Sequence, residues 1–532
     1  MQSHHSESVV ILGGGLAALS LSLQLKKKQP DLKILILEKH SYPPPQAAFK
    51  VGESTVEIAA MYFRDILGLD EQIADELPKF GLRFFMGDGS NLAIEERTEL
   101  GLSDFLPVRS FQLDRGRWEK ALTDEAKKRG IEFLDQARVT DVELGHFDHL
   151  VSYDHQGIGK QVRASWVVDA TSRPGFLKTK LGLKKKADHN INSVWFRLPL
   201  EIDVDQWAND PQWKGRVAQR RYLSTVHLLG EGYWVWLIPL SSGSTSIGIV
   251  ADERIHPLTG MNKFDRAMAW LEKYEPQCHQ KILPHIDKLQ DFLLLKHFTH
   301  KCKQVYSAHG WCITGEAGFF LDPFYSPGSD FIAISNSFVT DLIIGSREAV
   351  EEKAMQYDHR LKVLFQSVYP NYKDQYPIMG NRRVMPLKIT WDFFSYWSFL
   401  SLLFYRDALT DETKMEEAKM ALQGWFLLNS QMQDFFREWD QLDEPSLGGH
   451  DFIDYRSLPY LEAANHALIH PPDLSLGEEL AQNLAKAERI ASEMRFVGAL
   501  VHPGLGDWPK PEGQWMTQYL FEMLWPKEFS RL

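Results

Sequence analysis

Short apolar runs and longer mixed stretches alternate at the beginning of the chain. Val9–Leu12 and Lys33–Lys39 are two such apolar runs, and the stretch between them ends in Lys26–Lys28. Short apolar runs predict buried strands. Basic residues favour the C-terminal end of a helix, so the intervening stretch is predicted to be helical. The order strand, helix, strand indicates an α/β fold.

The pattern changes to short strands separated by Gly and Ser turns between residues 188 and 291. This pattern predicts an antiparallel sheet, with strands at Val194–Leu200, Tyr222–Leu228, Tyr233–Leu240 and Thr245–Ala251. Beyond about Glu348, longer apolar-periodic segments predict amphipathic or buried helices, at Trp391–Tyr405, Met415–Asn429 and Glu478–Phe496. We expect this helical region to cap the substrate end of the protein.

The chain is too long for one hydrophobic core, because 532 residues exceed the size at which a single core stops growing. We predict a nucleotide-binding domain whose first part covers residues 1–187 and whose return segment covers 301–347. The antiparallel sheet forms a substrate domain over 188–300, and the helical C-terminal region covers 348–532.

A glycine turn follows the first predicted strand. Gly13 allows a tight turn, Gly15 lets the backbone approach a pyrophosphate, and Ala18 is small enough for close packing of helix against strand. The second predicted strand closes on Glu38, at the spacing where an acid meets the ribose hydroxyls of a dinucleotide. A lone glycine motif is weak evidence, but the complete unit predicts a dinucleotide site.

Overall composition excludes several function classes. The formal charge of -12 argues against nucleic acid or an anionic membrane as a partner, because both need a basic surface. The three cysteines are far apart in sequence, which indicates neither a disulfide framework nor a metal site and fits a reducing, cytoplasmic location. Met1–Ser8 has no signal-peptide pattern. The run Phe393–Tyr405 is too short to span a membrane.

The most informative stretch is Gly232–Pro239, which reads Gly-Tyr-Trp-Val-Trp-Leu-Ile-Pro. Residues two apart on a strand share a face, so Trp234 and Trp236 are predicted to point the same way. Aromatic alternation also occurs in ordinary sheet cores. The Trp-x-Trp-x-Ile-Pro pattern nevertheless resembles that of the flavin-dependent halogenases, in which paired tryptophans lie between flavin and organic substrate and admit only a small species such as halide.

This resemblance implies a Rossmann-type FAD-binding domain of the flavin monooxygenase class, joined to an antiparallel substrate-domain sheet. It implies FAD contacts in segments beyond the glycine turn, at Ser54 in Gly-Glu-Ser-Thr, Arg115 in Leu-Asp-Arg-Gly-Arg, Glu316 in Gly-Glu-Ala, and Asp322. Ser54 or Thr55 would also suit the cap of the following helix. No second strand-glycine-helix unit of similar quality is present, so we expect a separate NAD(P)H flavin reductase to supply reduced FAD.

Lys79, in Leu-Pro-Lys-Phe-Gly, matches the essential lysine of the halogenases in type and local context. Hypohalous acid must be held beside an arene, and an ammonium group donates a hydrogen bond to it or, as free amine, forms a haloamine. Partial burial suits either role, because it lowers the pKa of a lysine. The competing interpretation is a solvated surface lysine, the usual situation for this residue type.

The segment Phe320–Gly328 matches the halogenase motif Phe-x-x-Pro-x-x-Ser-x-Gly and precedes a predicted helix, Ser329–Ile344. Helix N-termini attract anions. The resemblance therefore implies a halide site made by Ser326, Gly328 and Ser329. Pro327 departs from the pattern because it has no N–H to donate.

We hypothesise that this loss favours bromide or iodide over chloride, the more strongly hydrated ion. Proline also simply suits the first turn of a helix. A second departure is Tyr325, which replaces a glutamate of the tryptophan halogenases and makes free tryptophan a poor candidate substrate.

The sequence predicts an FAD-dependent halogenase that combines reduced FAD, oxygen and halide to make hypohalous acid, passes it to Lys79, and halogenates a small phenol, pyrrole or indole, free or carrier-bound. Two alternatives stay open. One is a related flavin monooxygenase or reductase that acts without halide, which Pro327 and Tyr325 favour. The other is a non-catalytic nucleotide-binding module, which would give Lys79, Trp234 and Trp236 no reason to occur together.

Overall fold

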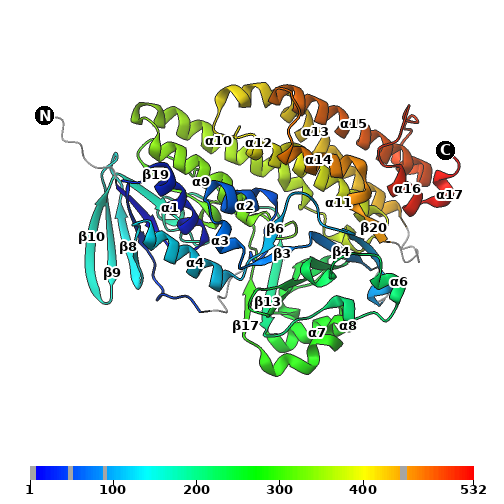
Figure 1. The fold of residues 1–532 in the computed structure, drawn as a ribbon, viewed down its shortest axis with the longest axis horizontal. Helices are drawn as coiled ribbons and strands as arrows, with labels where there is room; N and C mark the ends of the chain where they lie inside the picture. Colours follow the sequence, from blue (N-terminus) through cyan, green and yellow to red (C-terminus); the bar gives the residue numbers. More distant parts are fainter. Residues whose placement is uncertain (1–7, 46–51, 88–92, 444–451) are drawn as a thin grey trace. The chain divides into compact units, whose positions relative to one another are not determined.

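The computed structural model describes residues 8–45, 52–87, 93–443 and 452–532 (Figure 1). The chain forms two compact units, each assembled from three segments. Unit 1 contains Met1–Glu76, Leu113–Asp188 and Phe298–Phe365, and unit 2 contains Leu77–Gln112, His189–His297 and Gln366–Leu532. The first seven residues of the chain and Val51, which entered the sequence reasoning, lie outside the described residues.

Unit 1 is built on a five-stranded sheet in the order β19-β11-β1-β2-β7, and every neighbouring pair is parallel. The strands are β1 (Ser8–Leu12), β2 (Lys33–Leu37), β7 (Glu132–Leu134), β11 (Trp166–Asp169) and β19 (Trp311–Ile313). The helix α1 (Leu16–Lys28) connects β1 to β2, as the apolar pattern predicts. The Rossmann-type α/β prediction is confirmed for this unit.

Helices and a second sheet complete unit 1. The helix α1 contacts both α4 (Arg115–Lys128) and α9 (Gly328–Ile344), whose apolar residues are mostly buried. An antiparallel meander of β8 (Ala137–Glu143), β9 (His149–His155) and β10 (Ile158–Ala164) extends from the same unit (Figure 1).

Unit 2 contains an eight-stranded sheet in the order β17-β13-β16-β15-β14-β4-β5-β20. Its strands are β4 (Leu82–Met86), β5 (Thr98–Gly101), β13 (Ile191–Leu198), β14 (Thr225–Gly230), β15 (Tyr233–Pro239), β16 (Thr245–Asp252), β17 (Asp291–Leu295) and β20 (Phe452–Asp454). A strand occurs at each of the four predicted positions, but β14 begins at Thr225 instead of Tyr222, because Arg221–Leu223 forms a 3-10 helix. The sheet is nevertheless mixed, because β14 pairs with β4, and β5 with β20, in parallel.

One face of this sheet carries the main apolar core of unit 2. Alternate residues of the strands, among them Phe196, Val235 and Ile247, pack there with residues of α7 (Phe264–Tyr274) and α8 (Pro276–Ile282). The intervening residues of each strand therefore point to the opposite face.

The C-terminal part of unit 2 is helical, as predicted. Its main helices are α11 (Val384–Ser395), α13 (Glu412–Leu442) and α15 (Leu476–Val501), and α13 packs along α15. The predicted helix at Trp391–Tyr405 is one continuous helical stretch that passes through a π-helical segment, Tyr396–Ser401. Within the described ranges, we find no helix that combines the length and apolar character needed to cross a bilayer.

The unit boundaries and one helix cap differ from the sequence-based expectation. The substrate domain over 188–300 and the C-terminal region over 348–532 were predicted as separate, whereas most of both belongs to unit 2, and residues 348–365 belong to unit 1. Residues 1–187 were all expected in the nucleotide-binding domain, whereas Leu77–Gln112 clusters with unit 2 because β4 and β5 pair with its sheet. Ser54 or Thr55 was expected to cap the helix α2 (Glu57–Met61), but its N-cap is Val56, without a side-chain cap. Instead, Asp330 Oδ1 of α9 accepts a hydrogen bond from the Ala59 N–H at 2.9 Å.

Candidate functional site

The glycine turn between β1 and α1 has the conformation that its sequence predicts. Gly13 has φ of 91°, and a Cβ there would lie 2.8 Å from the Ala170 carbonyl oxygen. Only glycine suits this backbone geometry without strain. Ala18 is fully buried on α1, which is consistent with its predicted packing role.

Gly15 and Glu38 define the open side of this turn. Gly15 is the N-cap of α1, and a Cβ added there would meet no atom within 4 Å. The Glu38 carboxylate accepts hydrogen bonds from the N–H groups of Gly14 at 2.7 Å and His40 at 2.8 Å. A bare helix N-terminus beside a fixed carboxylate suits a pyrophosphate and ribose hydroxyls. The residues present therefore fit the dinucleotide part of FAD.

Arg115 connects a second segment to this unit. It is the first residue of α4, and its guanidinium donates to the Gly52 carbonyl at 3.2 Å and pairs with Glu119 at 2.6 Å. The Leu113 N–H also donates to the Glu53 carbonyl, at 2.6 Å. The Gly-Glu-Ser-Thr segment that contains Ser54 is thus held against the start of α4.

The remaining predicted residues of unit 1 lie in the return segment. Glu316 follows β19 and accepts a hydrogen bond from the Ser172 hydroxyl at 3.0 Å. Asp322 is buried, and its carboxylate accepts from the Phe324 N–H at 2.9 Å. Both side chains therefore have local structural contacts as well as their predicted cofactor role.

The candidate halide residues lie together at the N-terminus of α9. The helix begins at Gly328, one residue before the predicted start, and Pro327 is its N-cap. The Ser326 N–H donates to the Pro323 carbonyl at 2.9 Å, so it is used within the loop. The N–H groups of the first helical turn have no carbonyl partner within a helix. Gly328, Ser329 and the Ser326 hydroxyl are therefore the candidate donors.

In unit 2, Trp234 and Trp236 point from β15 to the face opposite the apolar core, and both are 2% exposed. Their ring centroids lie 5.7 Å apart. Trp234 Nε1 donates to the Tyr376 hydroxyl at 3.0 Å, and Trp236 Nε1 donates to Ser246 Oγ at 3.1 Å. Each indole is thereby fixed in orientation.

An aromatic row extends from these tryptophans across the sheet. Strand register places Phe84, His227, Trp236, Gly248 and Trp195 opposite one another on successive strands. Phe84 stacks on His227 at 4.6 Å, and Trp195 lies 6.5 Å from Trp236. We call this side of the sheet the tryptophan face. Sequence reasoning set His227 aside and did not identify Gly248, whose missing side chain leaves room for Trp236.

Lys79 ends β3 (Leu77–Lys79), which pairs with β6 (Ser110–Gln112). It is 2% exposed, which excludes the surface interpretation. Gln112 Nε2 donates to Thr225 Oγ1 on β14 at 2.9 Å, so β6 is attached to the large sheet. The structure thus places a desolvated lysine in unit 2, the unit that also carries the tryptophan face.

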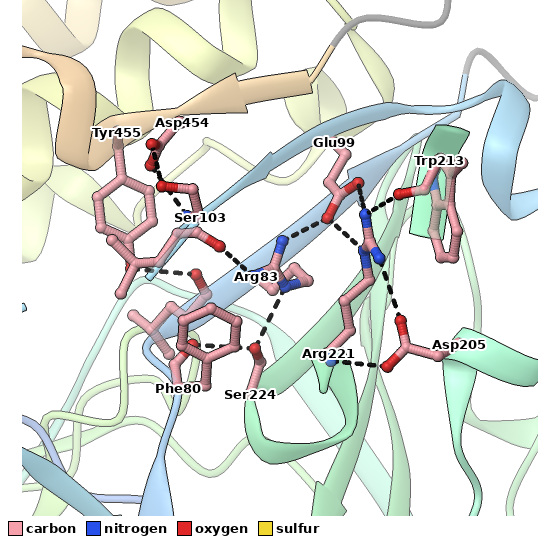
Figure 2. Close-up of polar contacts among 12 residues, drawn as sticks. Phe80, Arg83, Glu99, Ser103, Asp205, Trp213, Arg221, Ser224, Asp454 and Tyr455 are labelled. Carbon is pink, nitrogen blue, oxygen red and sulfur yellow. Dashed lines mark hydrogen bonds and ion pairs between the residues drawn. The ribbon is translucent and has the colours of Figure 1, made fainter. Parts of the chain in front are cut away.

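The chain immediately after Lys79 is held by a buried charge network (Figure 2). Phe80 N–H donates to Leu223 at 2.9 Å, and its carbonyl accepts from Ser224 Oγ at 2.9 Å. Arg83 Nε donates to the same Ser224 oxygen at 3.2 Å. These bonds fix the backbone on the C-terminal side of Lys79.

Glu99 is the anion at the centre of that network. It pairs with both Arg83 and Arg221, and all three side chains are fully buried. Arg221 also pairs with Asp205 at 3.1 Å and lies 3.7 Å from the centre of the Trp213 ring. Burial lowers the pKa of Arg83, whereas Glu99 opposes this effect. Sequence reasoning missed the network because its members come from distant segments.

Comparisons with known proteins show that the chain is similar in sequence to flavin-dependent halogenases. No protein-family model matches the chain. Flavin-dependent halogenase chlA of Dictyostelium discoideum is 27% identical over 430 residues, which cover 74% of this chain and 70% of that protein. The 1H-pyrrole-2-carbonyl-[peptidyl-carrier protein] brominase of Pseudoalteromonas luteoviolacea (strain 2ta16) is 26% identical over 369 residues, covering 68% and 82%.

Solved structures share the fold. The crystal structure of halogenase PltM has a TM-score of 0.63 and 16% identity, and the match covers 91% of this chain and 97% of that one. For CmlS, a flavin-dependent halogenase, the TM-score is 0.56 at 20% identity, with coverage of 88% and 78%.

Proposed function

Because the chain belongs to the flavin-dependent halogenase family, we propose that it combines reduced FAD, oxygen and halide to halogenate an electron-rich arene. The observation that carries this proposal is the presence, in one unit, of buried Lys79 and the buried pair Trp234 and Trp236. One relative's name specifies pyrrole held on a carrier protein. The substrate proposed here is a small phenol, pyrrole or indole, free or carrier-bound.

The glycine turn and its neighbours are the proposed FAD site. Its residues are Gly13, Gly15, Ala18, Glu38, Ser54, Arg115, Glu316 and Asp322. The open space at Gly15 and the fixed Glu38 carboxylate support this assignment. When bound in its reduced form, FAD supplies the reaction of oxygen with halide that yields hypohalous acid.

Lys79 is the proposed catalytic residue for transfer of the halogen. Its buried ammonium group donates a hydrogen bond to hypohalous acid and polarises the bond between oxygen and halogen, or its free amine carries the halogen. Removal from water strengthens such a hydrogen bond. Trp234 and Trp236 are proposed to keep the arene away from the cofactor, and hydrogen bonds to Tyr376 and Ser246 hold each indole in one orientation.

Halide is proposed to bind through Ser326, Gly328 and Ser329 at the start of α9. This group of donors is small, because the Ser326 N–H is used within the loop and Pro327 has none. A donor-poor site discriminates against the most strongly hydrated ion. We therefore propose a preference for bromide or iodide over chloride, which competition among equal concentrations of the three halides tests. Mainly chlorinated product would contradict it.

Reduced FAD is proposed to come from a separate NAD(P)H-dependent flavin reductase. A cytoplasmic location is also proposed, because all three cysteines are unpaired and buried, as expected in a reducing compartment.

The decisive experiment supplies the protein with FAD, a flavin reductase, NADH, oxygen and each halide, and screens phenols, pyrroles, indoles and carrier-bound arenes. The proposal expects product masses increased by one halogen only when halide is present. Hydroxylated product, or flavin turnover without halide dependence, would instead support the alternative monooxygenase or reductase. Pro327 and Tyr325 at the α9 loop are the features that favour this alternative.

A further inference from the structure

Asp291 lies at the start of β17, directly opposite Arg197 of β13. The next pair along these strands, Phe196 and Phe292, packs on the apolar core. Because side chains alternate along a strand, Asp291 and Arg197 point to the other side, which is the tryptophan face. Asp291 is therefore on the same face as Trp195, which neighbours Trp236 in the aromatic row.

The Asp291 carboxylate is removed from solvent without a hydrogen-bond partner. Its side chain has 0% exposure, and neither oxygen accepts a hydrogen bond from any residue that the structure describes. Arg197 Nε lies 4.0 Å from Oδ2, which is beyond hydrogen-bonding distance.

Further polar atoms on the same face share this property. Among the described residues, Trp195 Nε1 and Ser193 Oγ are also buried without a hydrogen-bond partner. Ser193, Trp195 and Arg197 alternate along β13, so their side chains leave the sheet on one side. Asp291 and Trp195 offer a carboxylate acceptor and an indole donor, whereas Ser193 lies opposite Leu295, at the other end of the paired segment.

Leaving such groups unsatisfied is unfavourable. Burying a donor or acceptor without a partner costs the free energy of its lost hydration, and a charged group costs more. Native proteins keep few of these groups, and those that they keep often have a ligand or a catalytic role. The Asp291 carboxylate and the Trp195 indole N–H are therefore candidate contacts for a bound polar group.

We propose, on the basis of the function proposed above, that the Asp291 carboxylate accepts the proton of a hydroxyl group on the aromatic substrate. Asp291 would then be a catalytic base that touches the substrate. The chemical class that fits is a phenol, because its O–H satisfies the carboxylate and its oxygen can accept from a neighbouring donor.

The proton balance explains why this contact promotes halogenation. As the O–H bond breaks, its proton moves to Asp291 and the oxygen electron pair is released into the ring. The ring carbon then attacks the halogen of hypohalous acid, so that a carbon–halogen bond forms and the oxygen–halogen bond breaks. The halogen is reduced and the ring is oxidised; the ring proton leaves, water is formed, and Asp291 returns its proton to the product oxygen.

The protonation properties of Asp291 support this role. Burial raises the pKa of the Asp291 carboxyl, outweighing the opposing effects of the Arg197 guanidinium and of the Arg197 backbone N–H. A carboxylate whose pKa is raised accepts a proton more readily, and base catalysis of this kind contributes about 10²–10⁴-fold to a rate.

The test compares a phenol with its methyl ether in the complete halogenating system. Asp291→Asn keeps the side-chain shape but removes the base. We expect kcat/KM for the phenol to fall about 10²-fold or more, with little change for the ether. Formation of hypohalous acid, measured by trapping with a small 1,3-diketone, should be unchanged. Asp291→Glu should restore part of the phenol activity.

A series of fluorinated phenols adds a readout that a structural role would not change. In Asp291→Asn, halogenation should depend more steeply on substrate acidity than in the wild type, because the base no longer assists. Asp287→Asn, which removes an exposed carboxylate four residues away, is the matched control and should change neither measurement.

The outcomes separate this inference from the proposed function. If the wild type halogenates no substrate, the proposed function fails. If it halogenates only arenes without a hydroxyl group, or if Asp291→Asn lowers phenol and ether activity equally or not at all, the inference is overturned while the halogenase assignment stands.

Discussion

Trp236 packs against the backbone of Gly248 on the neighbouring strand. A Cβ on Gly248 would lie 2.2 Å from one atom of the indole and 2.4 Å from two others. The position of this tryptophan therefore depends on a glycine twelve residues further along the chain. Gly248 belongs functionally to the Trp-x-Trp motif although it lies outside it.

Gly248→Ala should displace Trp236 and destabilise unit 2. Overpacking of this kind costs about 1–3 kcal/mol, which denaturant unfolding measures. In the halogenation assay we also expect less product for each reduced FAD consumed, because the barrier is disturbed. Gly260→Ala is the control, since its Cβ would meet no atom within 4 Å. Unchanged stability and yield in Gly248→Ala would show that Trp236 adapts without consequence.

Lys79→Ala should abolish arene halogenation while FAD binding and flavin reoxidation stay near wild type. The lysine is proposed to act after oxygen has reacted, so it has no part in holding the cofactor. Single-turnover product analysis and flavin absorbance measure the two properties separately. Lys214→Ala, at an exposed lysine of the same unit, should retain activity. Loss of FAD binding, or halogenation at a comparable rate, would remove Lys79 from the catalytic role.

Gly13 and Gly15 should respond differently to substitution. Gly13→Ala requires a left-handed backbone and a close contact with Ala170, so we expect loss of folding stability. Gly15→Ala adds a Cβ that meets no atom within 4 Å, so the protein should fold but bind FAD more weakly. Thermal unfolding and FAD titration distinguish the two. A Gly15→Ala variant with normal FAD affinity would contradict the pyrophosphate assignment.

Because Lys178 on α5 (Phe176–Lys180) is buried, we predict that the free energy of unfolding depends on pH. Its Nζ is buried with no hydrogen-bond partner among the described residues, and burial lowers its pKa to about 8. Between about pH 8 and the usual lysine pKa, the unfolded chain holds the proton that the folded chain has lost, so folding stability rises with pH.

Lys178→Met should therefore be more stable than the wild type at pH 7, and the difference should shrink by pH 10. Denaturant unfolding at the two pH values measures it. Lys180→Met, at an exposed position of the same helix, should show no comparable trend. An equal difference at both pH values would mean that the Lys178 pKa is not lowered.

Features that depend on neighbouring residues could be predicted from the sequence. The glycine turn and the paired tryptophans belong to this class, because the periods of strand and helix decide which way each residue points. Burial of Lys79 was only one of two open interpretations, since its local sequence does not define what packs around it.

Features that depend on strand register could not be predicted. Gly248 lies beneath Trp236, and Glu99 lies beside Arg83, because particular strands pair in a particular alignment. Arg221 reaches Glu99 from the 3-10 helix Arg221–Leu223 that precedes β14. The cap of α2 by Asp330 arises in the same way, from a residue 271 positions away. A periodic pattern identifies a strand without identifying its partner.

The Arg83–Glu99–Arg221 cluster restricts how this protein can change by mutation. Removing Glu99 alone would leave two buried cations without their shared anion, a loss of about 3–5 kcal/mol in comparable cases. Replacing either arginine alone would leave Glu99 paired with one buried cation instead of two. Sequences that keep the fold are therefore expected to change all three positions together. Libraries that aim to change substrate range by single substitutions should avoid these positions, because variants there would be lost to misfolding before any new selectivity was expressed.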